Sequence, residues 1–481
     1  MGVLAMEMNQ GHRSRTGTRE LSFSLIILLT ASVGAFAQSP PQSTLDQWKA
    51  TLQYGINSQI LDLIGTLKNQ QDGRLNKELI DVFNSTYDDS LRSAIVDLFV
   101  TLQYQGAETA MRDFVGTNPD NLGLLDSCLS YLAGTITHPE KKTVDLIASF
   151  ISNQNSGVSA TAIRGIGTIA TRDGTKAYDF TPVEKTLLDL LQANGTSQDI
   201  QENIVLTLGS LKAQQAVKAL ISILEDTGQP IVLREYAANS LGKIGDMAAI
   251  KPLSALLRDS NSMLRAYAVD AMSYFKTPEV DPMLIASLKD SFARVRSSAL
   301  AGVARNKLVT AIPAVIFKAE HDPDSTVQLA AIKTLGELGT SECWDALRSI
   351  YENTNLTVTR RGAALDQLVS GDLAGSLPSI EKVVKENWGT AGERTLDMTA
   401  KRLSTVKAPE LKSLFARFLG HPNPIIEVYG MRGISLNGFS DLKAEIEKLG
   451  GQYAPAYLKE QVKRTIDSLG GGSPATTPGA K

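Results

Sequence analysis

A dipeptide made of an aliphatic residue followed by a long polar residue recurs at intervals of 31 or 32 residues through the middle of the chain. Its four clearest copies are Leu233-Arg234, Leu264-Arg265, Val295-Arg296 and Val327-Gln328. A small residue follows each copy four positions later, and an apolar residue follows it eight positions later. These offsets lie on one face of an α-helix, and a fixed period of this length is typical of stacked helix pairs. The pattern therefore predicts a helical-repeat solenoid, which is above all an extended surface for binding.

Each repeat is predicted to hold two helices. The first carries the dipeptide, and the second is an apolar run such as residues 216–224 or 249–257. Gly245 and Gly339 stand where the first helix is expected to end, which suits a left-handed cap residue. Because one such pair is too short to form a core of its own, its stability is expected to come from stacking on neighbouring repeats.

Weaker copies extend the pattern towards both ends and bring the total to about eleven helix pairs. The pattern is clearest over residues 198–350. Residues 44–86 are predicted to form an N-terminal capping pair, and residues 454–469 a final capping helix with a more polar face. The predicted fold is all-α, an α-α superhelix over residues 38–469, followed by a disordered Gly- and Pro-containing tail at residues 470–481.

An aspartate precedes the dipeptide by a constant distance in three central copies. It stands six residues before the polar residue in the segments 259–265, 290–296 and 322–328, and a Leu-Gly step follows in the copies that begin at Leu233 and Val327. In these features the chain resembles the short HEAT-like repeats of the phycobilisome-lyase type, whereas the tetratricopeptide and ankyrin signatures are missing. The resemblance implies an α-α superhelix. It implies no single activity, because that family includes scaffolds, lyase subunits and adaptors.

Residues 1–37 are predicted to be a signal peptide. Three arginines precede the apolar stretch 21–30, and Ala35 and Ala37 supply the small residues of a signal-peptidase site. Cleavage between Ala37 and Gln38 is expected to release the mature chain into the bacterial periplasm or the extracellular space. An uncleaved membrane anchor is the alternative, although the apolar stretch is shorter than the ~20 residues that a spanning helix needs.

Composition disfavours nucleic-acid binding and metal chemistry. The formal net charge is −3, from 48 Lys and Arg against 51 Asp and Glu, so no basic surface for a polyanion is expected. His138, His321 and His421 are widely separated, and no metal or other cofactor is expected. Cys128 and Cys343 fall in distant repeats, far beyond the ~7 Å that a disulfide spans between Cα atoms, and both are predicted to be free thiols.

The recurring arginines Arg92, Arg234, Arg265 and Arg296 allow two interpretations. They form either a row of cations for an anionic ligand or a set of structural ties to the aspartates of the inter-repeat loops. The aspartates recur at the same offset in the central copies and would neutralise a cationic row, which favours structural ties.

The predicted function is that of an exported, non-catalytic scaffold or adaptor for a protein partner. The second helices are expected to line the concave face, with Lys218, Lys251, Asp345 and Arg348 exposed there. The interval between two repeats is longer around residues 171–182, and this insertion carries Tyr178 and Phe180 as candidate interface anchors, unless both rings fold back onto the adjacent helix. The alternative function is a lyase-like or other enzyme-associated subunit acting on a ligand in the concave groove.

Overall fold

The computed structural model describes residues 42–172, 178–389, 393–452 and 454–470. Within these residues all regular secondary structure is helical, with 26 α-helices and no strand. The predicted signal peptide, its cleavage site between Ala37 and Gln38, and nearly all of the predicted tail lie outside the described residues. The all-α solenoid expected from the dipeptide repeat is confirmed.

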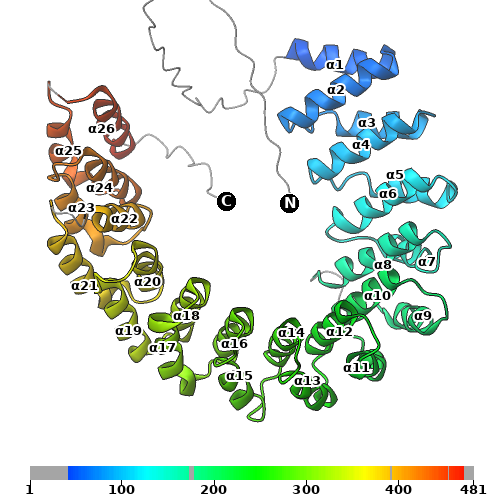
Figure 1. The fold of residues 1–481 in the computed structure, drawn as a ribbon. Coiled ribbons are helices and arrows are strands. Elements are labelled where there is room, and N and C mark those ends of the chain that lie inside the picture. The colour runs from blue at the N-terminus through cyan, green and yellow to red at the C-terminus, as the bar shows by residue number, and fades with distance from the viewer. Residues whose placement is uncertain (1–41, 173–177, 390–392, 453, 471–481) are drawn as a thin grey trace, which may run out of the picture.

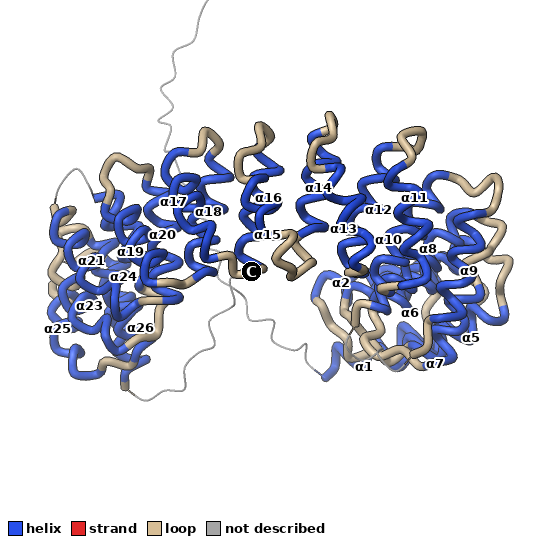
Figure 2. Tube along the Cα trace, turned by 90° about the horizontal axis from the view of Figure 1, so that it is seen from below, coloured by secondary structure: helices blue, strands red, loops and turns tan. Residues whose placement is uncertain are grey.

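The helices form two rows that follow one arc (Figures 1 and 2). The row on the convex side, called the outer row, consists of α1 (Gln42–Tyr54), α3 (Asn76–Ser85), α5 (Glu108–Thr117), α7 (Lys141–Ser149), α9 (Thr181–Gln192), α11 (Val217–Glu225), α13 (Ile250–Leu256), α15 (Asp281–Ser287), α17 (Ile312–His321), α19 (Ser341–Glu352), α21 (Leu373–Glu386), α23 (Lys412–Phe418) and α25 (Lys443–Leu449). The row on the concave side, called the inner row, consists of α2 (Asn57–Gln70), α4 (Asp89–Thr101), α6 (Leu122–Gly134), α8 (Ser156–Ala170), α10 (Gln198–Leu211), α12 (Ile231–Ile244), α14 (Ser262–Met272), α16 (Ala293–Arg305), α18 (Ser325–Leu338), α20 (Val358–Gly371), α22 (Glu393–Leu403), α24 (Pro424–Asn437) and α26 (Ala456–Leu469).

Each outer helix packs against the inner helix that follows it, so the 26 helices make 13 pairs where the sequence predicted about eleven. The difference arises at the ends, where the repeat pattern is weak. Residues 44–86, for example, were expected to hold one pair but contain most of α1 and all of α2 and α3.

The helices that carry the dipeptide form the inner row, which corrects one prediction. The second helices of the repeats, such as α11, α13 and α19, were expected to line the concave face, but they lie on the convex side (Figure 1). Consecutive inner helices contact one another extensively, whereas consecutive outer helices contact one another little. A row that packs more closely follows the shorter path around an arc, and it therefore faces the concave space.

Small residues make the close packing of the inner row possible. A Cβ atom placed on Gly242 of α12 would lie 2.6 Å from the Cα atom of Ala271 on α14. One placed on Gly209 of α10 would lie 2.7 Å from the Cβ atom of Ser240 on α12. Real side chains do not approach this closely, so these helices meet backbone to backbone, at positions where only glycine fits.

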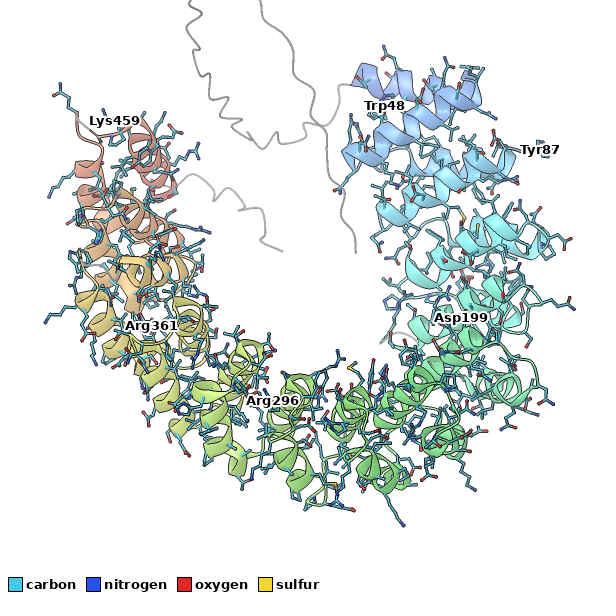
Figure 3. All side chains as sticks on the ribbon, viewed as in Figure 1. Trp48, Tyr87, Asp199, Arg296, Arg361 and Lys459 are labelled. Carbon is cyan, nitrogen blue, oxygen red and sulfur yellow. The ribbon has the colours of Figure 1, made fainter. Side chains whose placement is uncertain are left out.

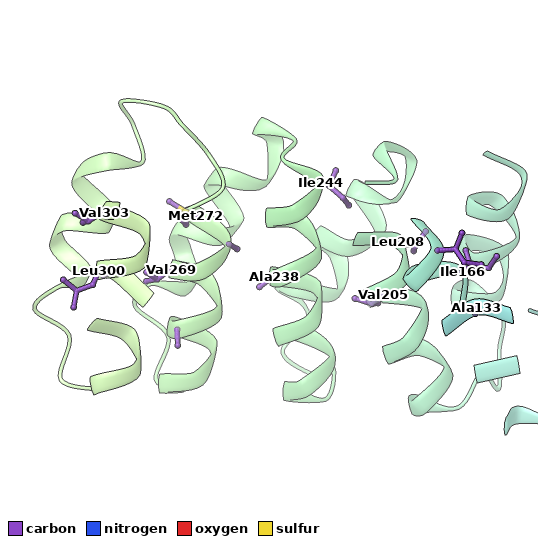
Figure 4. Close-up of a cluster of buried hydrophobic side chains, with 14 of the residues drawn as sticks. Ala133, Ile166, Val205, Leu208, Ala238, Ile244, Val269, Met272, Leu300 and Val303 are labelled. Carbon is purple, nitrogen blue, oxygen red and sulfur yellow. The ribbon is translucent and has the colours of Figure 1, made fainter. Parts of the chain in front are cut away.

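The core is one continuous cluster of buried apolar side chains, and Figure 4 shows the part of it that runs along successive inner helices. In α12 it contains Leu233, Ala237 and Leu241, all almost completely buried, at the motif position and at the offsets of four and eight. The same offsets are buried in α14, α16 and α18. Because every pair contributes to one cluster, a single repeat has no core without its neighbours.

The helix ends follow the chemistry expected of caps. The backbone of Gly245 has φ +76° and that of Gly339 has φ +69°, so both adopt the left-handed conformation predicted for them. Side-chain oxygens accept hydrogen bonds from the first free N–H groups of several inner helices; the residues that provide them are Asp88, Asn121, Asn155, Asn261, Asp324, Thr357 and Asn423. Across the described part of the chain, none of the helices has the length and apolarity needed to span a bilayer.

The close contact at Gly242 gives a testable prediction. Gly242→Ala is expected to lower the free energy of unfolding by about 1 to 3 kcal/mol, because the added methyl group has no room beside Ala271. Hydrogen exchange is expected to accelerate mainly in α11 to α15, since repeats stack only on their neighbours.

Gly65→Ala is the matched control, because a Cβ atom on Gly65 of α2 meets nothing within 4 Å. This exchange is expected to stabilise the protein by about 0.5 to 1 kcal/mol through the higher helix propensity of alanine. Equal effects of the two exchanges in urea unfolding would contradict the close packing of the inner row.

Candidate binding surface on the concave face

The motif arginines tie the loops of successive repeats together. Arg265 donates through Nε and Nη2 to the carboxylate of Asp290 at 2.8 and 2.9 Å, and Arg296 donates in the same way to Asp322 at 2.8 and 2.6 Å. A second branch of each guanidinium donates to the backbone carbonyl six residues earlier, at 2.9 Å in both cases. Gln328 makes the corresponding bond with its side-chain amide, at 2.6 Å. The charges of these arginines are thus neutralised inside the loops.

The other two motif arginines make a variant of the same contact. Nε of Arg234 donates to the carbonyl oxygen of Leu224 at 2.9 Å, and Nε of Arg92 donates to that of Phe83 at 3.1 Å. Both carbonyls lie near the end of the preceding outer helix. Arg296 is only 5% exposed and lies within the body of the arc (Figure 3). The structural interpretation of the arginine series is confirmed, and a cationic row for a ligand is wrong.

The four residues expected on the concave face lie on outer helices. Lys218 and Lys251 are exposed, and they belong to α11 and α13, which lie on the convex side of the arc. On α19, Nη2 of Arg348 donates to Asp345 at 2.6 Å, and its Nη1 donates to Asp372 at 2.5 Å. These four residues therefore do not form a concave surface. The small residues of the motif helices allow those helices to pack closely, so the motif helices form the inner row and the helices with these four residues form the outer row.

Tyr178 and Phe180 fold back onto the solenoid. Their ring centroids are 4.5 Å apart, and both rings pack against the core. The Tyr178 hydroxyl donates to Asp145 at 2.7 Å, and the ammonium group of Lys141 lies 5.5 Å from the centre of the Tyr178 ring. Residues 173–177 of the insertion lie outside the described residues. The geometry favours local packing of the two rings, and their role as interface anchors stays a prediction.

The concave surface itself consists of the exposed face of the inner helices. The positions on this face are counted from the motif residues Leu233, Leu264 and Val295. The face holds the residue directly before each motif residue and the residues about three, six and ten positions after it. Residues at this spacing lie on one side of an α-helix. We call this face the concave stripe. In its centre it consists of Val232, Tyr236, Asn239 and Lys243 on α12, Met263, Tyr267 and Asp270 on α14 with Tyr274 in the turn directly after that helix, and Arg294, Ala301 and Arg305 on α16.

Three tyrosines and two arginines meet at the centre of the concave stripe. The guanidinium of Arg294 lies 5.7 Å from the centre of the Tyr267 ring, and that of Arg305 lies 4.5 Å from the centre of the Tyr274 ring. Tyr236 occupies on α12 the position that Tyr267 has on α14. Tyr274 is 44% exposed, and Arg294 and Arg305 are exposed as well. These five residues are called the tyrosine–arginine patch, and they are of the types that dominate binding energy at protein interfaces.

Two carboxyl groups lie beside the tyrosine–arginine patch. Glu235 is only 8% exposed and makes no hydrogen bond or ion pair with any described residue. Burial raises the pKa of Glu235, against the opposing charge of Arg294. Burial also raises the pKa of Asp270, against a hydrogen bond from Ser298 and the nearby arginines. A poorly solvated acceptor, Glu235, therefore lies beside the patch, and its hydrogen-bonding capacity is unused among the described residues.

Groups that commonly hold metals or act as nucleophiles are dispersed. No cluster of three or more His, Cys, Asp or Glu side chains suited to a metal occurs among the described residues. His421, placed by sequence in a loop, is 1% exposed and stacks edge-on against Trp388 at 4.6 Å. Cys128 and Cys343 are buried free thiols, as predicted, and burial raises the pKa of Cys128 to about 12.

The sequence held a signal for the tyrosine–arginine patch that the sequence analysis did not use. Tyr236 and Tyr267 stand at the same position of consecutive repeats, three residues after Leu233 and Leu264. That position becomes a binding candidate only when the motif helix is known to face the concave space. The second helix of each repeat was expected to line the concave face, so Tyr236 and Tyr267 on the motif helices were not predicted as binding residues.

A family of helical-repeat proteins matches most of the chain. Residues 52–465 match the family described as Spirochaete HEAT repeat protein. The crystal structure of Kap121p is similar at 12% identity and a TM-score of 0.41, over 89% of this chain and 53% of Kap121p, so the chain spans about half the length of that protein. The complex of CpcE and CpcF of phycocyanin lyase from Nostoc sp. PCC7120 is similar at 18% identity and a TM-score of 0.30, over 60% of this chain and 94% of that one. No curated protein matches the chain in sequence.

The unpartnered carboxyl of Glu235 leads to a prediction on pH dependence. Because its pKa is higher in the folded chain than in the unfolded chain, Glu235 opposes folding increasingly as the pH rises through that raised pKa. Glu235→Gln is therefore expected to be more stable than the wild type at about pH 7, and the difference is expected to vanish near pH 4, where the unfolded carboxyl is largely protonated. Urea unfolding across this range measures the difference.

Asp290→Asn is a control of opposite sign. The hydrogen bonds from Arg265 hold the pKa of Asp290 below its ordinary value, so this carboxylate stabilises the fold above its unfolded pKa. The Asp290→Asn variant is expected to lose stability relative to the wild type as the pH rises from about 3 to 7. If Glu235→Gln followed the same trend as this control, the poorly solvated state of Glu235 would be refuted.

Proposed function

Because the chain belongs to the spirochaete HEAT-repeat protein family, we propose that it is a non-catalytic scaffold or adaptor that binds a protein partner on its concave face. The observation that supports this is the tyrosine–arginine patch in the centre of the concave stripe. Tyr267 and Tyr274 offer rigid amphipathic rings, and Arg294 and Arg305 are held against them without a buried salt bridge that would have to be broken. Such groups lose little conformational entropy when a partner covers them.

A protein fits this surface better than a polyanion does. The formal net charge of the whole chain is −3, and the carboxyls of Glu235 and Asp270 lie beside the two arginines of the patch. Nucleic-acid binding depends on a strong excess of cations, which this region lacks. A partner protein can instead place hydrogen-bond donors against Glu235 and apolar groups against the tyrosines.

One observation favours a second candidate, an enzyme-associated subunit that holds a ligand in the concave groove. Glu235 is a nearly buried carboxyl with a raised pKa and no partner, and such groups occur often at ligand sites. Under this alternative, a small molecule with a hydrogen-bond donor would bind at the carboxyl of Glu235. Protein binding remains preferred because the aromatic and cationic groups extend over three helices.

The scaffold is further proposed to work outside the cytoplasm of a bacterium. This proposal is supported by the basic region, the apolar stretch at residues 21–30 and the small residues before Gln38. In the native host, intact-mass analysis is expected to find a chain that begins at Gln38, with or without cyclisation of that glutamine. A full-length mass in the membrane fraction would instead indicate an uncleaved anchor.

Substitutions in the patch test the main proposal. Tyr267→Ala combined with Tyr274→Ala is expected to weaken partner binding by about 2 kcal/mol or more, which is about 30-fold in Kd, because both rings are removed from the centre of the interface. The partner is first captured from the native envelope fraction, identified by mass spectrometry and purified. Its affinity for each variant is then measured by calorimetry.

Tyr87→Ala serves as the control, because Tyr87 is 97% exposed and lies at the outer edge of the arc (Figure 3). Its affinity for the partner is expected to equal that of the wild type. Tyr178→Ala with Phe180→Ala tests the edge insertion separately. Unchanged affinity in the Tyr267/Tyr274 variant would refute binding at the centre of the concave stripe.

A further inference from the structure

The last three helices of the inner row each carry a basic side chain at the same position of the repeat. Lys401 of α22, Arg432 of α24 and Arg464 of α26 follow the first buried residue of their helix by six positions, and they are 31 and 32 residues apart. This position lies on the concave stripe. On α12, α14 and α16 it holds Asn239, Asp270 and Ala301 instead. We call Lys401, Arg432 and Arg464 the C-terminal basic row.

The charges of the C-terminal basic row are largely available to a partner. Lys401 and Arg432 are exposed, and their side chains make no hydrogen bond or ion pair with any described residue. Arg464 donates to Glu460 at 3.0 Å, one turn earlier on the same helix, and both side chains are more than half exposed. An exposed pair of this kind contributes little and yields easily to a competing carboxylate.

A groove runs beside two members of the row. It has a volume of about 580 Å³ and lies between α24 and α26, with Arg432 and Arg464 among its lining residues. Val428 and Leu436 contribute apolar surface, and Leu436 is 43% exposed. The C-terminal basic row is thus accompanied by a place for an apolar side chain, which a surface that binds only polyanions does not need.

The spacing of the row limits the shape of its ligand. Helices packed side by side lie about 8 to 10 Å apart, and an extended chain in the polyproline II conformation advances by about 3.1 Å per residue. An extended segment that runs along the arc therefore passes one helix of the row about every three residues. Polyproline II has three residues per turn, so carboxylates at every third position of such a segment point to the same side and each meets one cation of the row.

We propose that the C-terminal end of the concave face binds an extended acidic segment of a protein, whose carboxylates stand three residues apart opposite Lys401, Arg432 and Arg464 and which places an apolar side chain in the adjoining groove. This inference rests on the proposed use of the concave face for protein binding, and it assigns the partner chemistry of one end of that face. The charge of the row and the apolar groove both support this occupant.

The test uses the mature chain and two fluorescein-labelled peptides of equal composition. One peptide has glutamates at every third position separated by leucine and serine, and the other has the same residues with its glutamates contiguous. Fluorescence anisotropy is expected to show at least about tenfold tighter binding of the spaced peptide, since only that peptide fits both the row and the groove. Equal affinities would overturn the extended register.

Charge reversal locates the binding site. Lys401→Glu with Arg432→Glu and Arg464→Glu is expected to abolish binding of the spaced peptide. The matched control is Lys185→Glu with Lys218→Glu and Lys251→Glu, which makes the same change in net charge at exposed positions of α9, α11 and α13 on the outer row. Thermal melting checks that both triple variants are folded. Equal peptide binding by the two variants would overturn the proposal.

Two further measurements separate this inference from its alternatives. Glu460→Gln frees Arg464 and is expected to tighten binding of the spaced peptide, whereas a weaker complex would contradict the role of Arg464. Single-stranded DNA is expected to bind more weakly than the spaced peptide, and the opposite order would make the row a nucleic-acid site and overturn the proposal. The variant Tyr267→Ala with Tyr274→Ala is expected to keep peptide binding, so a failure at the basic row is distinguishable from a failure at the tyrosine–arginine patch.

Discussion

The close approach of neighbouring inner helices is the constraint on which the rest of the structure depends. Gly209 meets Ser240, and Gly242 meets Ala271, with no space for another side chain. The outer helices carry no comparable series of close contacts, and their row spreads. The difference in spacing between the two rows bends the stack into an arc. It also decides which helical face lines the concave space, and therefore which residues can form a binding surface there.

The Arg–Asp ties have a separate role, and they explain where free charge occurs. The motif arginine recurs in almost every central repeat, yet in the copies Arg265 and Arg296 its charge is held in bidentate contacts with Asp290 and Asp322. A charged residue that recurs together with an oppositely charged partner stabilises the repeat and is not available to a ligand. Charges that could recognise a partner are found at positions that vary from repeat to repeat, as on the concave stripe. Sequence variation within the repeat is thus more informative about binding than the motif itself.

The sequence predicted the solenoid, the helix caps and the structural role of the arginines, because each of these follows from local periodicity or from pairing at a fixed offset. Gly245 and Gly339, for example, needed only the repeat register to be assigned. Which row faces the concave space was predicted wrongly, since it depends on the relative spacing of two rows over many repeats. Lys218 and Lys251 were therefore placed on the wrong side, and Tyr236 and Tyr267 were overlooked. Weak end repeats also hid helices beyond the eleven expected pairs.

An arc of stacked helices presents its binding groups in the order of the sequence. The tyrosine–arginine patch on α12 to α16 therefore lies several repeats away from Arg432 on α24, along one continuous concave stripe. A compact ligand covers one of these regions, whereas an extended segment can reach both. Each region alone needs only moderate affinity, because a segment already held at one region meets the other at a high effective concentration. Under the proposed function, the linear order of the repeats, rather than the depth of a pocket, would therefore set the selectivity of this surface.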